Sequence, residues 1–331
     1  MKTFILSTFV GLFCTGTLYS QSMPPLPSGP NCHIVNVAKS INDGASYKQI
    51  AKNVLKSASV PDAVNFKGKN LIYYVNGSGG YEEHSIYVSE LTRNGTSSKV
   101  IGPIKIDGKI VKDAVDPDLI VMPNGKIRLF YYVGYFTVPV KEPKPNKIYS
   151  AISSDGINFK SEGAVVSLKN PSDPSVAMLK NGSFLLAVPQ GEKKQITLYT
   201  SQTGYNFKKL KTIAGGIPEL FVGSDGTINL MYQEKDMVLQ TSVNGGKTWV
   251  TSSRNLVEGS PTGSSSPSVL KLKGKESLMY YFWSQKNCTT SPTEFLKDKG
   301  SLGAMQPKNS KMGEPPLGHG VKPKGKKKVN E

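Results

Sequence analysis

Three acidic residues occupy equivalent places along the chain, each directly after a proline. They are Asp62, Asp118 and Glu219. If folding brings their carboxyl groups together, mutual repulsion raises some of the pKa values, so that one group stays protonated while another is ionised. Such groups can serve as a general acid and as a general base or nucleophile. The repeat that surrounds them predicts that they do meet.

Each of the three acids lies in a repeated segment of Pro, a small or acidic residue and then apolar residues. Successive prolines are 56, 57, 44 and 49 residues apart. A turn such as Asn124-Gly125 or Asp225-Gly226 follows, and a second apolar strand comes after it. A repeat near 50 residues built of short strands predicts an all-β, five-bladed β-propeller. The five segments are Pro61-Asp62-Ala63-Val64, Pro117-Asp118-Leu119-Ile120, Pro174-Ser175-Val176-Ala177, Pro218-Glu219-Leu220-Phe221 and Pro267-Ser268-Val269-Leu270.

The fifth repeat lacks its two outer strands, and the N-terminal part of the chain can supply them. Residues 33–39 and 49–55 read as these strands, so we expect the N-terminal strands to complete blade five and close the ring. Ring closure would bring Cys32 beside Cys288. Two cysteines in an exported protein predict one disulfide, with a pair of buried free thiols as the alternative.

A second repeated pattern resembles the Asp-box of sialidase-type propeller repeats. Ser242 to Trp249 fits it with Asn in place of the usual Asp, and residues 40–47, 153–159 and 201–207 are further or shortened copies. The Asn or Asp caps the turn, the glycine takes positive φ, and the aromatic residue packs back between sheets. We therefore expect a structural role for these turns, on the face away from any ligand.

With five blades and acids at the mouth of the inner strands, the chain resembles the clan of arabinanase-, xylosidase- and invertase-type glycoside hydrolases. The resemblance covers about residues 32–288. It implies Asp62 as base or nucleophile, Asp118 or Asp116 as the group that orients or tunes, and Glu219 as the acid. The clan usually places its Asp before the proline, as in Asp116-Pro117. Blade one instead reads Val60-Pro61-Asp62, and Glu219 also follows its proline.

The same face should carry a substrate pocket, because the turns after each second strand open there. Aromatic rings there can stack on sugars, and amide side chains can bind hydroxyl groups. The substrate-binding candidates are Asp116, Asp173, Tyr135, Gln190, Gln233 and Trp283.

Several other chemistries are disfavoured. No Cys/His metal spacing, phosphate loop or nucleophile elbow is found, so neither a metal nor a cofactor is expected. A sialidase needs three convergent arginines, and Arg93, Arg128 and Arg254 do not converge in the predicted ring.

Composition predicts an exported, basic protein. Residues 1–20 read as a signal peptide, whose apolar run is short for a membrane anchor. Residues 21–288 would form the propeller, and residues 289–331 a disordered tail that could contact an anionic surface or serve solubility. The net charge is +17, and lysine outnumbers arginine 38 to 3. Such a charge favours acidic partners, and the absence of interleaved basic and aromatic runs disfavours nucleic acid.

We therefore expect a secreted monomer, extracellular or periplasmic, that acts on a glycan or polysaccharide of anionic or neutral type. The favoured prediction is a glycoside hydrolase that uses the carboxylates at the channel mouth. One alternative is a non-catalytic propeller that binds carbohydrate or a polyanion, and another is a protein-interaction scaffold.

Overall fold

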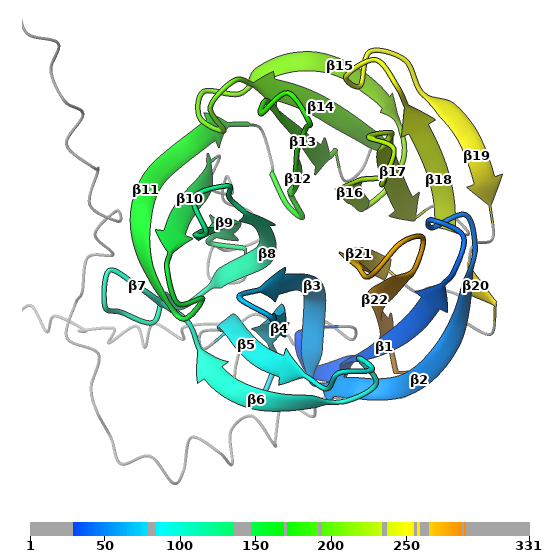
Figure 1. The fold of residues 1–331 in the computed structure, drawn as a ribbon. Coiled ribbons are helices and arrows are strands. Elements are labelled where there is room, and N and C mark those ends of the chain that lie inside the picture. Colours follow the sequence, from blue (N-terminus) through cyan, green and yellow to red (C-terminus); the bar gives the residue numbers. More distant parts are fainter. Residues whose placement is uncertain are drawn as a thin grey trace, which may run out of the picture.

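In a computed structural model, five antiparallel sheets surround a central pore, which confirms the predicted five-bladed β-propeller (Figure 1). The structure describes residues 29–78, 84–135, 147–168, 171–190, 194–233, 237–254, 257–258, 265–285 and 288. The predicted signal peptide and basic tail lie outside these ranges. Within them, no helix is long and apolar enough to cross a bilayer.

Blades one to four are each built from consecutive strands, with the first strand at the pore and the last at the rim. Blade one contains β3 (Ala58–Phe66), β4 (Lys69–Asn76), β5 (Ser85–Leu91) and β6 (Ser98–Pro103). Blade two contains β8 (Ala114–Val121), β9 (Ile127–Val133), β10 (Lys147–Ser153) and β11 (Asn158–Ser167). Blade three contains β12 (Ser175–Met178), β13 (Phe184–Pro189), β14 (Gln195–Ser201) and β15 (Lys208–Ala214). Blade four contains β16 (Pro218–Val222), β17 (Ile228–Gln233), β18 (Met237–Ser242) and β19 (Val250–Arg254).

Blade five joins the two ends of the chain, as predicted. Its inner strands are β21 (Ser265–Lys271) and β22 (Ser277–Ser284), and its outer strands are β1 (His33–Ser40) and β2 (Tyr47–Lys56). The pairing of β1 with β22 is unbroken over all eight residues of each strand. The ring therefore closes by a sheet rather than by a loop.

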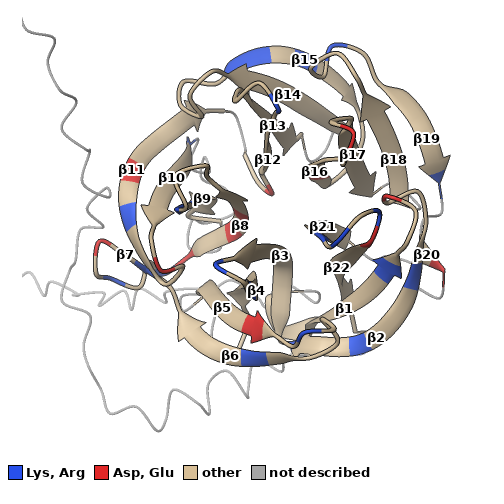
Figure 2. Ribbon diagram, in the orientation of Figure 1, with Lys and Arg blue, Asp and Glu red and all other residues tan. Residues whose placement is uncertain are grey.

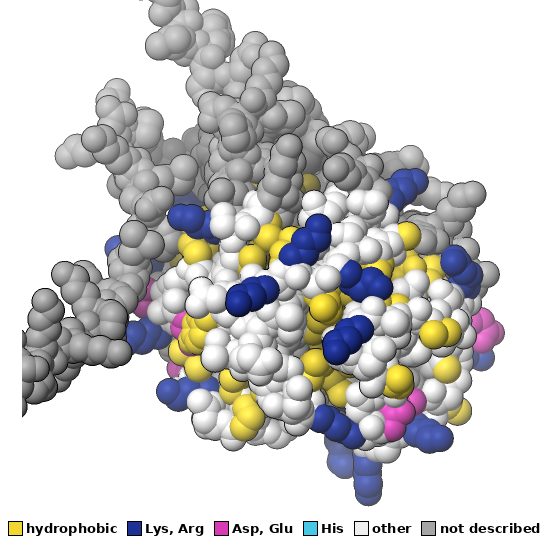
Figure 3. Space-filling view, turned by 90° about the horizontal axis from the view of Figure 1, so that it is seen from above, with side chains coloured by type: hydrophobic (Ala, Val, Ile, Leu, Met, Phe, Trp, Pro, Cys, Tyr) yellow, Lys and Arg dark blue, Asp and Glu magenta, His cyan; other side chains and the backbone are white. Residues whose placement is uncertain are grey.

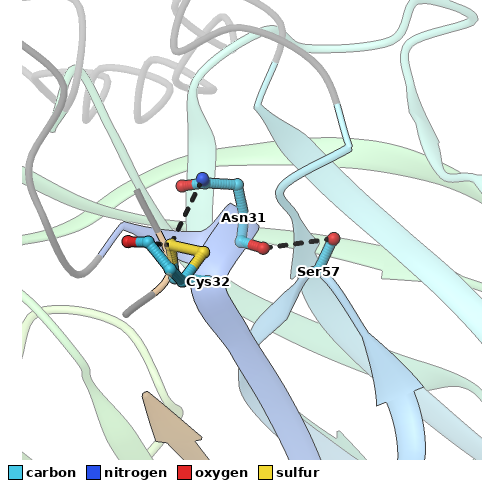
Figure 4. The surroundings of a disulfide bond; sticks show 4 residues. Asn31, Cys32 and Ser57 are labelled. Atoms are coloured by element: carbon cyan, nitrogen blue, oxygen red, sulfur yellow. Dashed lines mark hydrogen bonds between the residues drawn. A yellow bond between two sulfur atoms is a disulfide. The ribbon is translucent and has the colours of Figure 1, made fainter. Parts of the chain in front are cut away.

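A disulfide fastens this closure. The short 3-10 helix η1 (Pro30–Cys32) leads into β1, and Cys32 is bonded to Cys288, with Cα atoms 5.5 Å apart. Figure 4 shows the bond beside Asn31, whose backbone carbonyl accepts a 3.2 Å hydrogen bond from the Ser57 hydroxyl at the start of blade one. The predicted pairing is confirmed.

Two blade edges are covered by the segment that leaves the preceding blade. The short strand β7 (Lys105–Ile106) follows blade one and pairs in parallel with β11 of blade two. Likewise β20 (Val257–Glu258) follows blade four and pairs with β2 of blade five. These pairings occupy hydrogen-bonding groups that an open sheet edge would expose.

The second strand of each blade is buried on both faces, because neighbouring blades pack against each side of it. Tyr73 on β4 and Tyr131 on β9 belong to the apolar cluster between blades one and two and are almost completely buried. The Tyr73 hydroxyl also donates a 2.8 Å hydrogen bond to the Gly156 carbonyl of blade two. Tyr73 is thus held between blade one and blade two.

The turns on the other face share one hydrogen-bond pattern. In blade four the Asn244 side chain accepts from the Thr248 backbone N–H at 2.9 Å, and the Trp249 indole donates to the Gly246 carbonyl at 2.9 Å. In blade two, Asp155 accepts from the backbone N–H groups of the residues two and three positions later. The capping role predicted for these turns is therefore present, and their assignment as Asp-boxes stays a prediction.

A β-bulge occurs where the repeat proline lies inside the first strand. In β3 the pairing passes from Ser59↔Val75 to Asp62↔Tyr73, so one extra residue is inserted. The same shift occurs in β8 and β21. The residue before the proline has positive φ in each case, at Val60, Asp116 and Ser266. Because proline has no N–H to donate, a bulge is where a strand can accept it.

Candidate active site at the pore

The five residues that follow the repeat prolines form one closed ring around the pore, which we call the pore ring. Each side chain accepts a hydrogen bond from a backbone N–H of the next blade. The five bonds are Leu119 N to Asp62 Oδ2 (2.7 Å), Val176 N to Asp118 Oδ2 (2.9 Å), Leu220 N to Ser175 Oγ (2.8 Å), Val269 N to Glu219 Oε1 (2.8 Å) and Ala63 N to Ser268 Oγ (2.9 Å).

In every case the donor is the residue directly after the ring member of the next blade. In blades one, two and five, the residue after the proline is also the one at which regular strand pairing resumes after the bulge. Two further bonds run within the ring: Ser268 Oγ donates to Asp62 Oδ1 at 2.8 Å, and Ser175 Oγ donates to Glu219 Oε2 at 3.1 Å. The pore ring therefore links all five blades.

The three carboxyl groups of the pore ring lie together, as the sequence predicted. One oxygen from each of Asp62, Asp118 and Glu219 lies within 4.8 Å of the others, and the three side chains are 6–7 % exposed. They line a cavity of about 20 Å³, which is room for one water molecule. The three carboxyl groups that the sequence analysis assigned to catalysis therefore lie together, with little free space between them.

Burial and mutual repulsion raise the pKa values of this trio. Burial raises the pKa of Asp62 to about 6, against the hydrogen bonds from Ser268 and Leu119 that favour the charged form. Burial, and then the Asp62 charge, raise the pKa values of Asp118 and Glu219 well above their usual ranges. All three groups therefore cannot be ionised together at neutral pH without a compensating charge.

A second pair of carboxyl groups, Asp116 and Asp173, comes from the residues before the prolines in blades two and three. We call it the mouth pair. The Asp173 backbone N–H donates to Asp116 Oδ2 at 3.0 Å. Burial raises the pKa of Asp173 to about 6, and burial together with the Asp173 charge raises that of Asp116 well above its usual range. Asp173 is half-buried and Asp116 is buried.

Tyr135 lies next to the mouth pair and is 41 % exposed. Burial, followed by the charges of Asp116 and Asp173, raises the pKa of its phenol to about 12. Its ring packs edge-on against Tyr132, with centroids 6.4 Å apart. The mouth pair thus has an exposed aromatic ring beside it, and Figure 2 shows an acidic stretch on β8, the strand of blade two next to the pore.

The structure does not bring the remaining candidates to the pore. Gln190, Gln233 and Trp283 are half-buried at the ends of the second strands of blades three, four and five, and none of them lines the cavity. The Gln190 backbone N–H bonds to the Gln195 carbonyl across the following turn, and the Gln233 backbone N–H bonds to the Ile217 carbonyl just before β16. Sequence reasoning did not single out Ser266, which lines the cavity. Its signal was the Ser-Pro at the position that Asp occupies in blades two and three.

Comparisons with known proteins show the fold. No protein-family model matches the chain, and no curated protein matches it in sequence. Among solved structures, Zg3597, a family 117 glycoside hydrolase of the marine bacterium Zobellia galactanivorans, is 14 % identical over 80 % of this chain and 94 % of its own, with a TM-score of 0.50. A GH43_1 enzyme from Xanthomonas citri is 17 % identical over 65 % of this chain and 82 % of its own, with a TM-score of 0.51.

These likenesses confirm that the chain has the propeller fold of glycoside hydrolases, which is the resemblance expected from the repeat. At 14 % and 17 % identity, these likenesses support the fold and do not support a particular activity or substrate. The activity, the ligand and the acting residues therefore depend on the site itself.

Proposed function

We propose that this protein is an exported, glycan-directed glycoside hydrolase that acts at the mouth of the pore, at the mouth pair and Tyr135. The observation that carries the proposal is the hydrogen bond from the Asp173 backbone N–H to the Asp116 carboxylate, which places two acidic residues of neighbouring blades side by side near an exposed aromatic ring. Burial raises the pKa values of both carboxyl groups. Hydrolysis of a glycosidic bond needs two carboxyl groups in different protonation states.

In this proposal Asp116 is the acid, because it is the more buried of the two and burial favours the protonated form that can donate to the leaving oxygen. Asp173 is the base or nucleophile, because it is the more exposed of the two and ionises near pH 6. Tyr135 offers a ring face on which a sugar can stack. Whether the reaction retains or inverts configuration depends on the carboxyl separation in the complex.

The sequence-based assignment uses Asp62 as base or nucleophile, Asp118 as the tuning group and Glu219 as the acid. Two observations favour the mouth pair over it. The three trio side chains are buried, whereas Asp173 is half-buried, and a sugar ring must reach the catalytic carboxyl groups. Each trio member also already accepts a backbone hydrogen bond that joins two blades.

A panel of neutral and anionic polysaccharides, with detection of new reducing ends, tests the proposal. We expect Asp173→Asn and Asp116→Asn each to lower kcat by at least about a hundredfold, which is the size of a general acid–base contribution. Glu219→Gln tests the sequence-based assignment, in which Glu219 is the acid. Its melting temperature must be measured beside its rate, because Glu219 also accepts a hydrogen bond that joins two blades. Full loss of activity in Glu219→Gln with an unchanged melting temperature, and normal rates in both mouth variants, would contradict the mouth assignment.

The second candidate is a non-catalytic propeller that binds glycan or a polyanion. The specific observation in its favour is Val60, which occupies in blade one the position before the proline where the resembling clan carries an acid. The basic rim supports an anionic ligand: Lys and Arg lie on outer strands such as β2, β6 and β15 (Figure 2), and on one side of the ring they outnumber acidic side chains (Figure 3). Saturable, salt-sensitive binding of a polysaccharide that remains uncleaved would establish this candidate.

A further inference from the structure

We propose that the outer strands of blades three and four form a docking surface for an anionic lipid membrane. The strands concerned are β14 and β15 in blade three and β18 and β19 in blade four, together with the turn between β18 and β19. Lysines on this surface would contact the charged headgroups, and valines beside them would enter the apolar layer. We call the surface the docking corner; its residues are Lys208, Lys209, Lys211, Lys247, Val243 and Val250.

The first observation is the distribution of charge among the outer strand pairs. Residues 195–214 of blade three contain three lysines and no Asp or Glu. Residues 237–254 of blade four contain two basic residues and, again, no Asp or Glu. These neighbouring blades therefore form a basic sector without acids, which attracts a negatively charged surface. The outer strand pairs and turns of blades one, two and five differ, because they contain acidic residues, namely Glu90, Asp155, Glu162 and Asp43.

The lysines of the two blades lie side by side. The Lys211 ammonium group donates a 3.0 Å hydrogen bond to the backbone carbonyl of Lys247, and Lys208 and Lys209 lie just before Lys211 on β15. None of these four lysines forms an ion pair with an acidic side chain in the part of the chain that the structure describes. Figure 3 views the ring from the side on which Figure 1 shows β15, and basic side chains lie among apolar ones there.

The second observation is a pair of exposed valines at the turn that Lys211 contacts. Val243 is 87 % exposed, more than any other large apolar side chain in the described ranges, and Val250 is 68 % exposed. The turn is held in place, because the Trp249 ring packs against the apolar cluster between blades three and four and its indole N–H bonds within the turn. The valines therefore stay beside the lysines and in contact with solvent.

The valines favour a membrane over a soluble polyanion. A polysaccharide or a nucleic acid would pair with the lysines and leave both valines in water. A bilayer interface accepts both kinds of side chain, because lysine ammonium groups stay at the headgroups while apolar side chains lie deeper. Lysine near an anionic leaflet and exposed apolar groups also act together, since either signal alone gives weak binding.

The inference does not rest on the proposed function. Docked in this way the ring stands on its rim. Three strand spacings, about 14 Å, separate β15 from β12 at the pore. The mouth pair therefore stays clear of the lipid, so membrane binding and glycan hydrolysis can succeed or fail separately.

Co-sedimentation of the full-length mature protein with sucrose-loaded vesicles tests the surface. Vesicles of phosphatidylcholine with about one-third phosphatidylglycerol are compared with vesicles of phosphatidylcholine alone. We expect binding to the anionic vesicles to be at least about tenfold tighter in about 0.1 M salt, and to weaken as the salt concentration rises.

A pair of valine variants tests the apolar contribution. Val243→Ser combined with Val250→Ser should weaken vesicle binding at least about tenfold, because two apolar side chains no longer leave water. The matched control is Val100→Ser combined with Ile101→Ser, on the rim strand β6. These two residues are 57 % and 44 % exposed, and the control should bind vesicles as the wild type does.

A pair of lysine variants tests the charge contribution. The first combines Lys208→Gln, Lys209→Gln and Lys247→Gln, and it should weaken vesicle binding at least about tenfold. The second makes the same change in net charge at three exposed lysines of β2 and should weaken it less than about threefold. All four variants alter exposed side chains, so each should keep its melting temperature and hydrolyse soluble glycans at the wild-type rate. The substitutions on β2 are Lys48→Gln, Lys52→Gln and Lys56→Gln.

Three results would overturn the inference. The first is no preference for anionic vesicles at about 1 mM lipid, a concentration that detects weak peripheral binding. The second is an equal loss of binding in the docking-corner variants and their controls, which would show a diffuse effect of net charge. The third is unchanged binding in the valine variant together with full displacement from vesicles by dextran sulfate, which would assign the corner to a soluble polyanion.

Discussion

Replacing Ser268 by Ala should destabilise the propeller far more than the loss of one small hydroxyl suggests. Ser268 is 1 % exposed, and its Oγ accepts from the Ala63 backbone N–H and donates to Asp62 Oδ1. The substitution leaves a buried N–H without a partner, at about 1–3 kcal/mol, and removes a bond to a carboxyl group worth about 1.5–3 kcal/mol. We expect a loss of about 3–5 kcal/mol in the free energy of unfolding, against a typical total of about 5–15 kcal/mol.

The control is the same substitution two residues earlier in the same strand. Ser266 is also buried and its Oγ has no hydrogen-bond partner in the described part of the chain, so Ser266→Ala should not lower the free energy of unfolding and should raise it by up to about 1–3 kcal/mol. Urea unfolding, followed by circular dichroism with the disulfide intact, gives both values. If the two variants differ by less than about 1 kcal/mol, the pore ring does not hold the blades together as described.

Three further perturbations probe the closure, the turns and the mouth. Replacing both Cys32 and Cys288 by Ser should lower the free energy of unfolding by about 5 kcal/mol on the loop-entropy relation, measured by urea unfolding; a change below about 1 kcal/mol would contradict it. Asp155→Ala should cost about 1 kcal/mol at pH 7, and Asp155→Asn much less, because Asn caps the equivalent turn in blade four. Because hydrogen bonds from Asn158, Ile157 and Ser153 outweigh burial and lower the pKa of Asp155, its contribution is present above about pH 4 and should decline as the pH falls toward the lowered pKa; a difference that stays constant from about pH 5 down to about pH 2 would refute this. Since the pKa of Asp173 is raised to about 6, kcat/KM should rise as the pH increases through 6 while Asp116 stays protonated; a flat profile between pH 4 and 8 would exclude Asp173 as the base.

The fold could be predicted from the sequence because a propeller repeats its signals. A proline, an apolar run and an Asn-Gly or Asp-Gly turn recur in step, so each copy supports the others. The strands β1 and β2 cover the residues 33–39 and 49–55 that the pattern assigned to them. The fifth repeat also predicted how the ring closes. It contains only the two inner strands of a blade, and the N-terminal part of the chain contains two strands that belong to no other repeat.

The site was harder to predict, because its decisive feature is a shift of one residue. The repeat showed that Asp62, Asp118, Ser175, Glu219 and Ser268 are equivalent, but not what their shared position does. Only the folded chain shows the bulges, with positive φ at residues such as Asp116, and the bonds that the residue after the proline accepts from the next blade. Bulges depend on strand pairing, which local sequence does not report.

The substrate contacts predicted at Gln190, Gln233 and Trp283 stay predictions. These residues were chosen by their place after the second strand of each blade, which fixes the face of the ring but not the distance from its axis, and none of them lines the pore cavity.

The bond between Cys32 and Cys288 turns the polypeptide between them into a covalent circle. A protease that cuts once in any surface loop within this circle opens it without releasing a piece, and the nicked protein would migrate as one species until a reductant is added. Such a molecule can tolerate damage that would dismantle an open chain, which suits a protein exposed to hydrolytic enzymes outside the cell.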